Sequence, residues 1–205
     1  GYYPDSRAPG LFVPGGFELP ASKSTVEWMD RDHLFVSPAF DSTTMTTSTY
    51  GRIVKEWARG TPFASATTVY EANVDDLAVG AYRAATPGLE RDVVQRYITR
   101  VNLEFDVRRE GRFVKIEKPG DVRVDFFREW ILFSPQEDWP LVGKTYKAGS
   151  LLAANLDRWM AGDRAIDVLF EPGERASLLS NEATRSAILA VELSNVRSRA
   201  YAYRH

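Results

Sequence analysis

Residues 102–118 read NLEFDVRREGRFVKIEK, and this stretch decides the fold. Apolar and charged side chains alternate on both sides of Glu110-Gly111, with the period of two that is typical of a β-strand. A two-residue turn at Glu110-Gly111 is favourable because glycine adopts positive φ without strain. The pattern therefore predicts a β-hairpin.

The same stretch specifies the register of the hairpin. With the turn at Glu110-Gly111, Phe105 lies opposite Ile116 on an apolar face, and Asp106 lies opposite Lys115 on a charged face. A slip of one residue would move the apolar side chains into water. We expect the charged face to be solvated.

Similar short segments recur along the rest of the chain, separated by Gly, Pro, Asp and Asn. Their spacing of roughly 8–12 residues is typical of sandwiches and propellers. Four strands in a repeat of about 40–50 residues is the propeller period. The segments that we interpret as strands are 25–29, 33–39, 53–57, 66–70, 77–81, 122–127, 129–133, 150–155 and 166–170.

Three stretches depart from this pattern. Residues 156–161 predict a single helical turn, and residues 138–144 are typical of turns. Residues 181–194 are helical by propensity but also alternate, so we favour a strand hairpin with residues 200–203.

These patterns predict an all-β fold, a partial β-propeller of four-stranded antiparallel blades. The domain boundaries that we expect are an irregular entry segment at residues 1–24 and a propeller fragment of roughly four blades at residues 25–205.

The composition excludes several classes of function. The chain has 205 residues and a formal net charge of −2, which argues against nucleic-acid and anionic-membrane partners. It contains no Cys, so thiol catalysis, disulfides and thiolate metal sites are excluded. No motif for a cofactor or phosphate loop is present, and we predict no cofactor. The first residue is not Met, and we interpret the N-terminus as a cut or processed end of a soluble cytoplasmic or periplasmic protein.

Histidine is the scarcest catalytic residue type in the chain. Only His33 and His205 occur, and no Gly-x-Ser-x-Gly motif is present. His33 lies beside Asp30 and Asp32, so one hypothesis is a metal or base site built from these three residues. The favoured interpretation is a polar turn before a strand, because Asp is common in turns. We therefore predict no catalytic, cofactor-binding or metal-binding residue in this chain.

Two acidic pairs could in principle perform acid–base chemistry. Glu104 and Asp106 lie on the same side of one predicted strand, where solvated cross-strand charge pairs with Lys115 are the favoured interpretation. Asp75-Asp76 is interpreted as turn chemistry.

Basic residues gather near the end of the predicted hairpin, but acidic residues surround them. A nucleic-acid patch is therefore disfavoured, and a positively charged rim at a propeller channel or domain interface is the other interpretation. We interpret the five Trp residues as blade packing rather than a stacking platform. The basic residues are Arg108, Arg109, Arg112 and Lys115.

Three blocks, in order along the chain, resemble the propeller of the prolyl oligopeptidase family of serine peptidases. Residues 26–36 read VEWMDRDHLFV and residues 48–62 read STYGRIVKEWARGTP, which is similar to the Trp-x-Asp, Ser-Gly-Tyr-Pro-Arg and Trp-x-Arg-Gly-Thr segments of bacterial members. The sequence departs from that pattern at Thr49 and Gly51, which flank Tyr50. Further matches are KAGSLLA followed by VLFEPGERASL, and then VELSNVRSR, at residues 147–153, 168–178 and 191–199.

The resemblance implies a fragment of an N-terminal β-propeller domain, which in the family has seven blades and caps an α/β-hydrolase domain with a Ser-Asp-His triad. It implies a serine-type endopeptidase as the parent protein, with short peptides as substrates and the hydrolase domain as partner. The chain itself is then expected to be inactive and to gate access to that domain. The alternative function is a self-standing β-rich module that binds protein or carbohydrate. Because open sheet edges invite association, we also expect pairing of two copies through blade edges.

Overall fold

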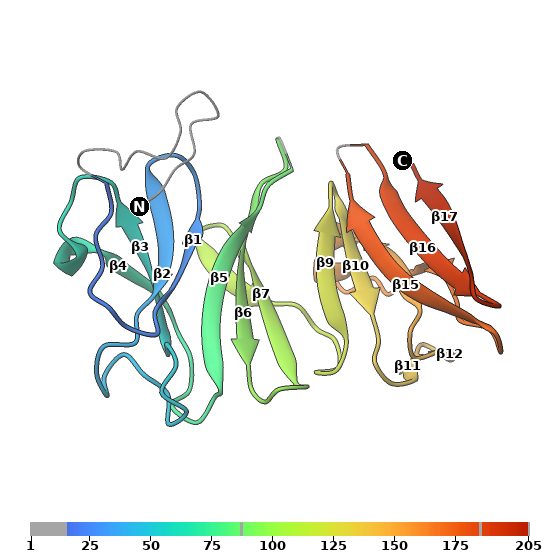
Figure 1. Ribbon diagram of the computed structural model, residues 1–205, viewed down its shortest axis with the longest axis horizontal. Helices are drawn as coiled ribbons and strands as arrows, with labels where there is room; N and C mark the ends of the chain where they lie inside the picture. Colours follow the sequence, from blue (N-terminus) through green and yellow to red (C-terminus); the bar gives the residue numbers. More distant parts are fainter. Residues whose placement is uncertain (1–15, 87, 185, 205) are drawn as a thin grey trace. The chain divides into compact units, whose positions relative to one another are not determined.

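The structure is a computed structural model that describes residues 16–86, 88–184 and 186–204. Antiparallel strands dominate it, with one short α-helix, α1 (Leu156–Met160), and a 3₁₀ turn at Phe63–Ser65 (Figure 1). No helix within these residues is long and apolar enough to cross a membrane. The all-β prediction is confirmed, and four successive antiparallel sheets have the form of propeller blades.

The first sheet has the strand order β1-β2-β3-β4. Leu34, Val36 and Trp57 are buried on one side with Phe17, which extends the sheet's core to the entry segment. Phe35 and Val54 are buried on the other side. Both faces are therefore covered, as a propeller blade requires. The strands are β1 (Thr25–Trp28), β2 (His33–Ser37), β3 (Ile53–Ala58) and β4 (Thr67–Glu71).

The second sheet has the order β5-β6-β7-β8 and contains the predicted hairpin. Glu110 and Gly111 have φ of 48° and 78°, as the two central residues of a type I′ turn require. The Ile116 N–H donates to the Phe105 carbonyl over 2.8 Å, which confirms the predicted register. The strands are β5 (Ala78–Ala84), β6 (Arg91–Tyr97), β7 (Leu103–Arg109) and β8 (Arg112–Lys115).

The third sheet has the order β14-β13-β10-β9, and a small hairpin is inserted between β10 and β13. Helix α1 follows β13 directly, and the Asn155 side chain caps it by accepting from the Arg158 N–H over 3.1 Å. The helical turn predicted at this place is confirmed. The strands are β9 (Arg123–Phe127), β10 (Trp130–Ser134), β13 (Leu151–Asn155) and β14 (Asp167–Phe170), and the hairpin is β11 (Trp139–Leu141) with β12 (Lys144–Tyr146).

The fourth sheet has three strands, in the order β15-β16-β17. They are β15 (Ala176–Ala183), β16 (Ile188–Ser194) and β17 (Arg197–Tyr203). The tail is therefore a strand hairpin, as predicted, and not a helix.

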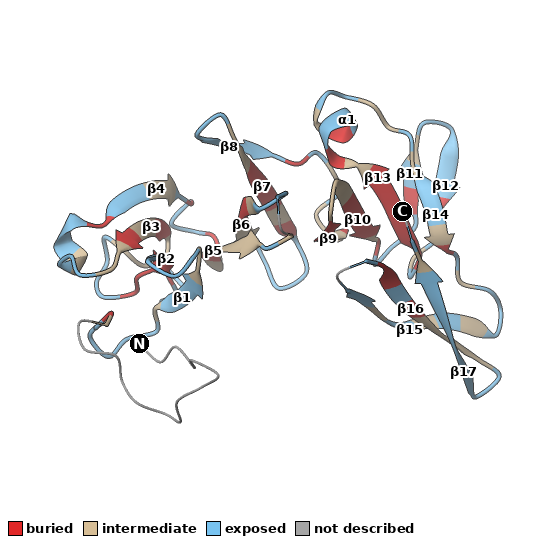
Figure 2. Ribbon diagram, turned by 90° about the horizontal axis from the view of Figure 1, so that it is seen from above, coloured by how far each residue is buried: buried red, intermediate tan, exposed pale blue. Residues whose placement is uncertain are grey.

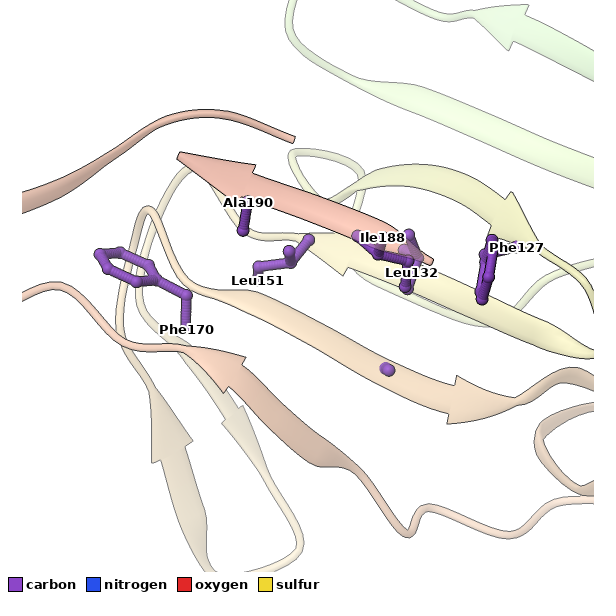
Figure 3. Close-up of a cluster of buried hydrophobic side chains, with 7 residues drawn as sticks. Phe127, Leu132, Leu151, Phe170, Ile188 and Ala190 are labelled. Atoms are coloured by element: carbon purple, nitrogen blue, oxygen red, sulfur yellow. The ribbon is translucent and has the colours of Figure 1, made fainter. Parts of the chain in front are cut away.

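The chain divides into two compact units. The described part of the first unit comprises residues 16–83, 92–100 and 106–114, and the second unit comprises the other described residues. In the second unit, Ile188 and Ala190 of β16 pack with side chains of the third sheet (Figure 3). This cluster buries the two β16 side chains, and Leu178 of β15 and Tyr203 of β17 are partly buried against it. Figure 2 shows the contrast between the buried β13 and the exposed β17.

Several strand predictions were incomplete. The sequence patterns did not indicate β6 or β15, and the stretch predicted as turns at 138–144 contains β11 and part of β12. Residues 16–24 contain no regular strand, which agrees with the predicted entry segment, while its first 15 residues lie outside the described residues. The boundary at residue 24 stays a prediction.

The expectation that Asp106 faces solvent was wrong. Asp106 is buried, and its carboxylate accepts a hydrogen bond of 3.0 Å from the Tyr70 hydroxyl of β4. The face of β7 that carries Asp106 is covered by Tyr70 of the first sheet, so period-two charges do not identify an exposed face. Lys115 instead pairs with Glu104 over 2.8 Å.

The turn between β16 and β17 carries a strained valine. Asn195 and Val196 have φ of 50° and 65°, and Val196 is 94% exposed. Positive φ is unfavourable for a β-branched residue. Val196→Gly, which creates the Asn-Gly pair preferred in type I′ turns, is therefore expected to raise the free energy of unfolding by about 1 kcal/mol.

Urea unfolding checks this prediction. Val168→Gly, in the middle of β14 and also partly exposed, is the matched control and should destabilise the protein by roughly 0.5–1 kcal/mol. Equal destabilisation by both changes would contradict the assignment of strain to Val196.

Candidate functional site

The three residues considered for a metal or base site do not converge. The His33 imidazole bonds the Asp30 carboxylate over 2.9 Å, but Asp32 pairs with Arg59 over 3.1 Å. Asp30 also accepts from the Asp32 N–H, as in a polar turn. Burial alone would raise the pKa of Asp30, but these hydrogen bonds and the His33 charge lower it. The turn interpretation is confirmed.

A charged network joins the first and second sheets within the first unit. Asp92 of β6 is 7% exposed and accepts two hydrogen bonds from Arg83, at 2.6 and 3.0 Å. Arg108 of β7 lies 3.5 Å from the same carboxylate and donates to Glu56 of β3. Arg83 is also 3.8 Å from Asp30. One buried carboxylate therefore compensates two guanidinium groups.

Arg108 is also sandwiched by aromatic rings. Its guanidinium lies 4.7 Å from the ring centre of Phe113 and 5.9 Å from that of Phe35. It is therefore directed into the interior of the unit. Since Lys115 pairs with Glu104, the structure does not bring the predicted basic cluster together as one patch.

A second buried polar group lies between β4, β6 and β7. Burial and the charge of Asp106 raise the pKa of Tyr70 well above its usual value, so the phenol stays a hydrogen-bond donor. Asp76, buried in the turn before β5, accepts hydrogen bonds from Arg96 at 2.8 and 3.0 Å and from the Asn73 N–H at 3.0 Å. Asp76 is thus both a turn residue, as predicted, and half of a buried ion pair.

Lys118, in the second unit, is a half-buried cation. Its ammonium group donates to the carbonyl oxygens of Leu103 at 2.7 Å and Pro119 at 3.0 Å, and lies 5.1 Å from the Phe105 ring centre. Burial lowers the pKa of Lys118 to about 8, although the charges of Asp121 and Glu104 oppose this shift. No electrophile or second titratable group completes a catalytic pair with it in the part of the chain that the structure describes.

The Lys118 shift predicts a specific pH dependence of stability. The unfolded chain binds more protons than the folded protein between pH 8 and the ordinary lysine pKa of about 10.4, so the free energy of unfolding should rise through this interval. Below pH 8 the penalty for burying the charge is fully present. Urea titrations at pH 7.5, 9 and 10.5 measure the slope.

Lys118→Met is the control for that titration, because it keeps the apolar stem and removes the charge. The rise attributed to Lys118 should disappear in this variant. An identical rise in both proteins would assign the effect to other groups.

The second unit contains a pocket of about 460 Å³ between the third and fourth sheets. Its walls are mainly apolar, and the Tyr203 hydroxyl donates to the Leu169 carbonyl across it. It could hold an apolar side chain, but it presents no nucleophile with a base. The lining residues include Phe127, Trp130, Ala153, Asp167, Leu169, Ile188, Tyr203 and Arg204.

Catalytic geometry was therefore not found among residues 16–86, 88–184 and 186–204. The one histidine that they include, His33, bonds only Asp30 through its ring, and no group of three potential metal ligands lies close together in them. His205 lies outside the described residues. The sequence patterns missed the Arg83–Asp92–Arg108 network, for which the signal was the charged residues on both sides of Val93-Val94.

The known proteins that are similar to this chain are peptidases. No protein family model matches the chain. An uncharacterized peptidase of Sinorhizobium fredii is 24% identical over 208 residues, covering 93% of this chain but 28% of that protein. The chain thus spans little more than a quarter of this relative.

The solved structures agree with this relation. A post-proline cleaving enzyme from Rickettsia typhi superposes with a TM-score of 0.79 and 17% identity, over 89% of this chain and 28% of that one. A structure from an analysis of two prolyl endopeptidases gives a TM-score of 0.63 with 13% identity, over 88% of this chain and 26% of that one. The sheets and these matches show a propeller-type fold, and the proteins that the chain resembles are peptidases. More specifically, its fold is similar to part of the prolyl oligopeptidases, as the three sequence blocks implied.

Proposed function

We propose that the chain is the non-catalytic β-propeller portion of a prolyl-oligopeptidase-like serine peptidase, where it restricts access to a hydrolase domain to short peptides. The match to little more than a quarter of a post-proline cleaving enzyme carries this proposal. The catalytic residues would come from the remainder of such a protein. Propeller blades can exclude large substrates because they enclose a narrow channel.

The ionic contacts between sheets support a gating role. A gate must keep its blades together while peptides pass, and Arg108 of the second sheet pairs with Glu56 of the first sheet within the first unit. This is a structural contribution rather than a chemical one. Partners in this proposal are the hydrolase domain and the short peptides.

A chimera tests the proposal. The matching part of the Rickettsia typhi enzyme is replaced by this chain, and cleavage of a short proline-containing chromogenic peptide is compared with cleavage of a long unfolded protein. We expect turnover of the peptide only, and no turnover by the isolated chain. Robust cleavage by the isolated chain, or equal cleavage of both substrates by a folded chimera, would refute the proposal.

Pairing of two copies through open sheet edges is part of the same proposal, for conditions in which no other strand covers those edges. Size-exclusion chromatography over a range of concentrations measures it. A monomer at high concentration would count against this association without affecting the gating role.

A further inference from the structure

The connection between β13 and β14 encloses a small cavity in the second unit. Residues 156–166 form this connection and include α1. The corresponding connection in the second sheet is the two-residue turn at Glu110-Gly111, so the connection in the third sheet is an enlargement. The cavity has a volume of about 170 Å³. Its lining residues are Trp130, Asn155, Arg158, Trp159, Asp163, Ala165, Ile166 and Asp167.

The strand register places three of the lining side chains on one face of the third sheet. Trp130 of β10 lies opposite Asn155 of β13. Ala153, two residues earlier on β13, lies opposite Asp167 of β14. Positions two apart on a strand share a face, so Trp130, Asn155 and Asp167 project from the same side. The cavity therefore combines an aromatic ring, an amide and a carboxylate.

Among the described residues of the cavity wall, one charge lacks an opposite charge. Arg158 donates to the Asp163 carboxylate at 2.8 Å and lies within 2.6 Å of it through a second nitrogen, so these two residues neutralise each other. Asp167 forms no ion pair or side-chain hydrogen bond in the part of the chain that the structure describes. The wall therefore has one net negative charge, which complements a single cation.

A nearby arginine leaves Asp167 without a partner. Arg204 and Asp167 both line the larger pocket between the third and fourth sheets, yet no ion pair joins them within the described residues. Asp167 is exposed, whereas Trp159 is only 2% exposed. The carboxylate is therefore accessible to a cation from solution, and the ring of Trp159 closes the interior side of the cavity.

The aromatic walls favour a planar cation. Trp130 and Trp159 both line the cavity. The guanidinium of Arg164 lies 4.4 Å from the ring centre of Trp159, so a guanidinium already packs on an indole at this end of the sheet. A guanidinium stacks on rings and bonds a carboxylate through two N–H groups, whereas an ammonium is a compact and strongly hydrated charge. The wall therefore suits arginine better than lysine.

We propose that this cavity binds the side chain of an arginine from a partner peptide, with the guanidinium paired to Asp167 and packed against Trp130. The inference goes beyond the gating role and holds whether or not the chain belongs to a peptidase. The charge of Asp167 discriminates against neutral side chains, and the indole discriminates against lysine. Because one side chain in a small cavity buries little surface, the binding is weak and requires peptide at mM concentration.

Peptides that differ in one side chain test the site. Acetyl-Ala-Arg-Ala-amide is titrated into the isotope-labelled full chain, and the analogues with citrulline or Lys in place of Arg are the controls. Citrulline keeps the shape of the arginine side chain without its charge. The indole N–H signals of Trp130 and Trp159 report on the cavity, and those of Trp28 and Trp57 report on the first unit. We expect the Arg peptide to shift only the signals of the cavity and to bind at least about tenfold more tightly than either analogue.

Two variants locate the binding. Asp167→Asn removes the charge at nearly constant size and should reduce the preference for Arg over citrulline to less than about twofold. Glu174→Gln removes an exposed carboxylate that does not line the cavity, so this matched control should keep the preference. The spectrum of each variant shows whether it is folded. The peptide series on the unchanged chain tests the inference even if a variant does not fold.

Four results would overturn the inference. They are no shift of the Trp130 or Trp159 signal at about 10 mM peptide, equal binding of the Arg and citrulline peptides, equal binding of the Arg and Lys peptides, or an undiminished preference in Asp167→Asn. None of these results affects the substrate selection of the chimera. Failure of the arginine site is therefore distinguishable from failure of the proposed function.

Discussion

Replacing Phe133 with alanine is expected to lower the free energy of unfolding by about 3–5 kcal/mol. Phe133 of β10 is fully buried, with 0% of its surface exposed. Its ring lies 5.4 Å from that of Trp139 in an edge-to-face arrangement and 4.7 Å from that of Trp159. The change would remove the shared neighbour of two large rings and leave a cavity that they cannot easily fill.

The surroundings of Phe133 explain why the site cannot collapse. The Trp159 indole N–H donates to the Glu117 carbonyl over 3.1 Å, and the Trp159 ring lies under the guanidinium of Arg164 at 4.4 Å. Trp159 belongs to α1, whose orientation is also fixed by the Asn155 cap. Trp159 is therefore held in place from outside the cavity and cannot easily move to fill it.

Urea unfolding followed by tryptophan fluorescence and near-UV circular dichroism measures the loss. Leu179→Ala is the matched control, because Leu179 is 60% exposed and should change stability by about 0.5 kcal/mol or less. A loss below about 1 kcal/mol for Phe133→Ala would mean that the aromatic cluster does not hold the second unit together.

The strands were predictable where apolar and charged residues alternate strictly. The β7–β8 hairpin has strict alternation and a glycine at the position that needs positive φ, so both its turn and its register follow from the sequence. Strand β6 was missed because Val93-Val94 are adjacent and buried on opposite faces, with charged residues beside them. A strand covered on both faces loses its period-two pattern.

Local chemistry misled the prediction at the inserted hairpin. Pro140 argues against strand pairing, yet it lies within β11 and pairs with Thr145 of β12. Val142 is unfavourable in a tight turn, yet it has φ of 43° in the turn between the two strands. Burial of Trp139 and Tyr146 in the adjacent core compensates for these local penalties. Such compensation depends on tertiary contacts and cannot be derived from a single segment.

The charged network was harder to predict from the sequence than the strands were. Sequence spacing identifies which residues share a strand face, but the partner of a charge depends on which sheet covers that face. Arg108 was grouped with Arg109 and Lys115 by proximity in the chain, whereas its partners are Asp92 and Glu56 from two other strands. The absence of an assembled basic patch follows from packing, not from composition.

Replacing Asp92 with alanine is expected to destabilise the protein by about 3–5 kcal/mol, because two partly buried guanidinium groups lose their shared carboxylate. Arg83 would lose both hydrogen bonds to Asp92 and keep only a distant interaction with Asp30 at 3.8 Å. Arg108 would retain Glu56, but the Arg108 Nε is already buried without a partner.

A surface ion pair provides the control for this change. Lys147 and Glu171 lie 3.0 Å apart with side chains 57% and 44% exposed, so Glu171→Ala should cost about 0–1 kcal/mol. Urea unfolding of the two variants in the same buffer gives the comparison. If Asp92→Ala lost no more stability than Glu171→Ala, water would have to solvate both arginines, and Asp92 would not stabilise the second sheet.

A triple variant shows how much of the destabilisation by Asp92→Ala comes from leaving the two arginines without a carboxylate. Asp92→Leu with Arg83→Met and Arg108→Met replaces all three charges by apolar side chains of similar length. Because desolvation offsets much of the attraction in a buried ion pair, this triple variant should be more stable than Asp92→Ala by about 1–4 kcal/mol, although it lacks every interaction that Asp92→Ala removes. The opposite order would mean that the two arginines, which Asp92→Ala retains, gain more from Glu56, Asp30 and water than their burial without Asp92 costs.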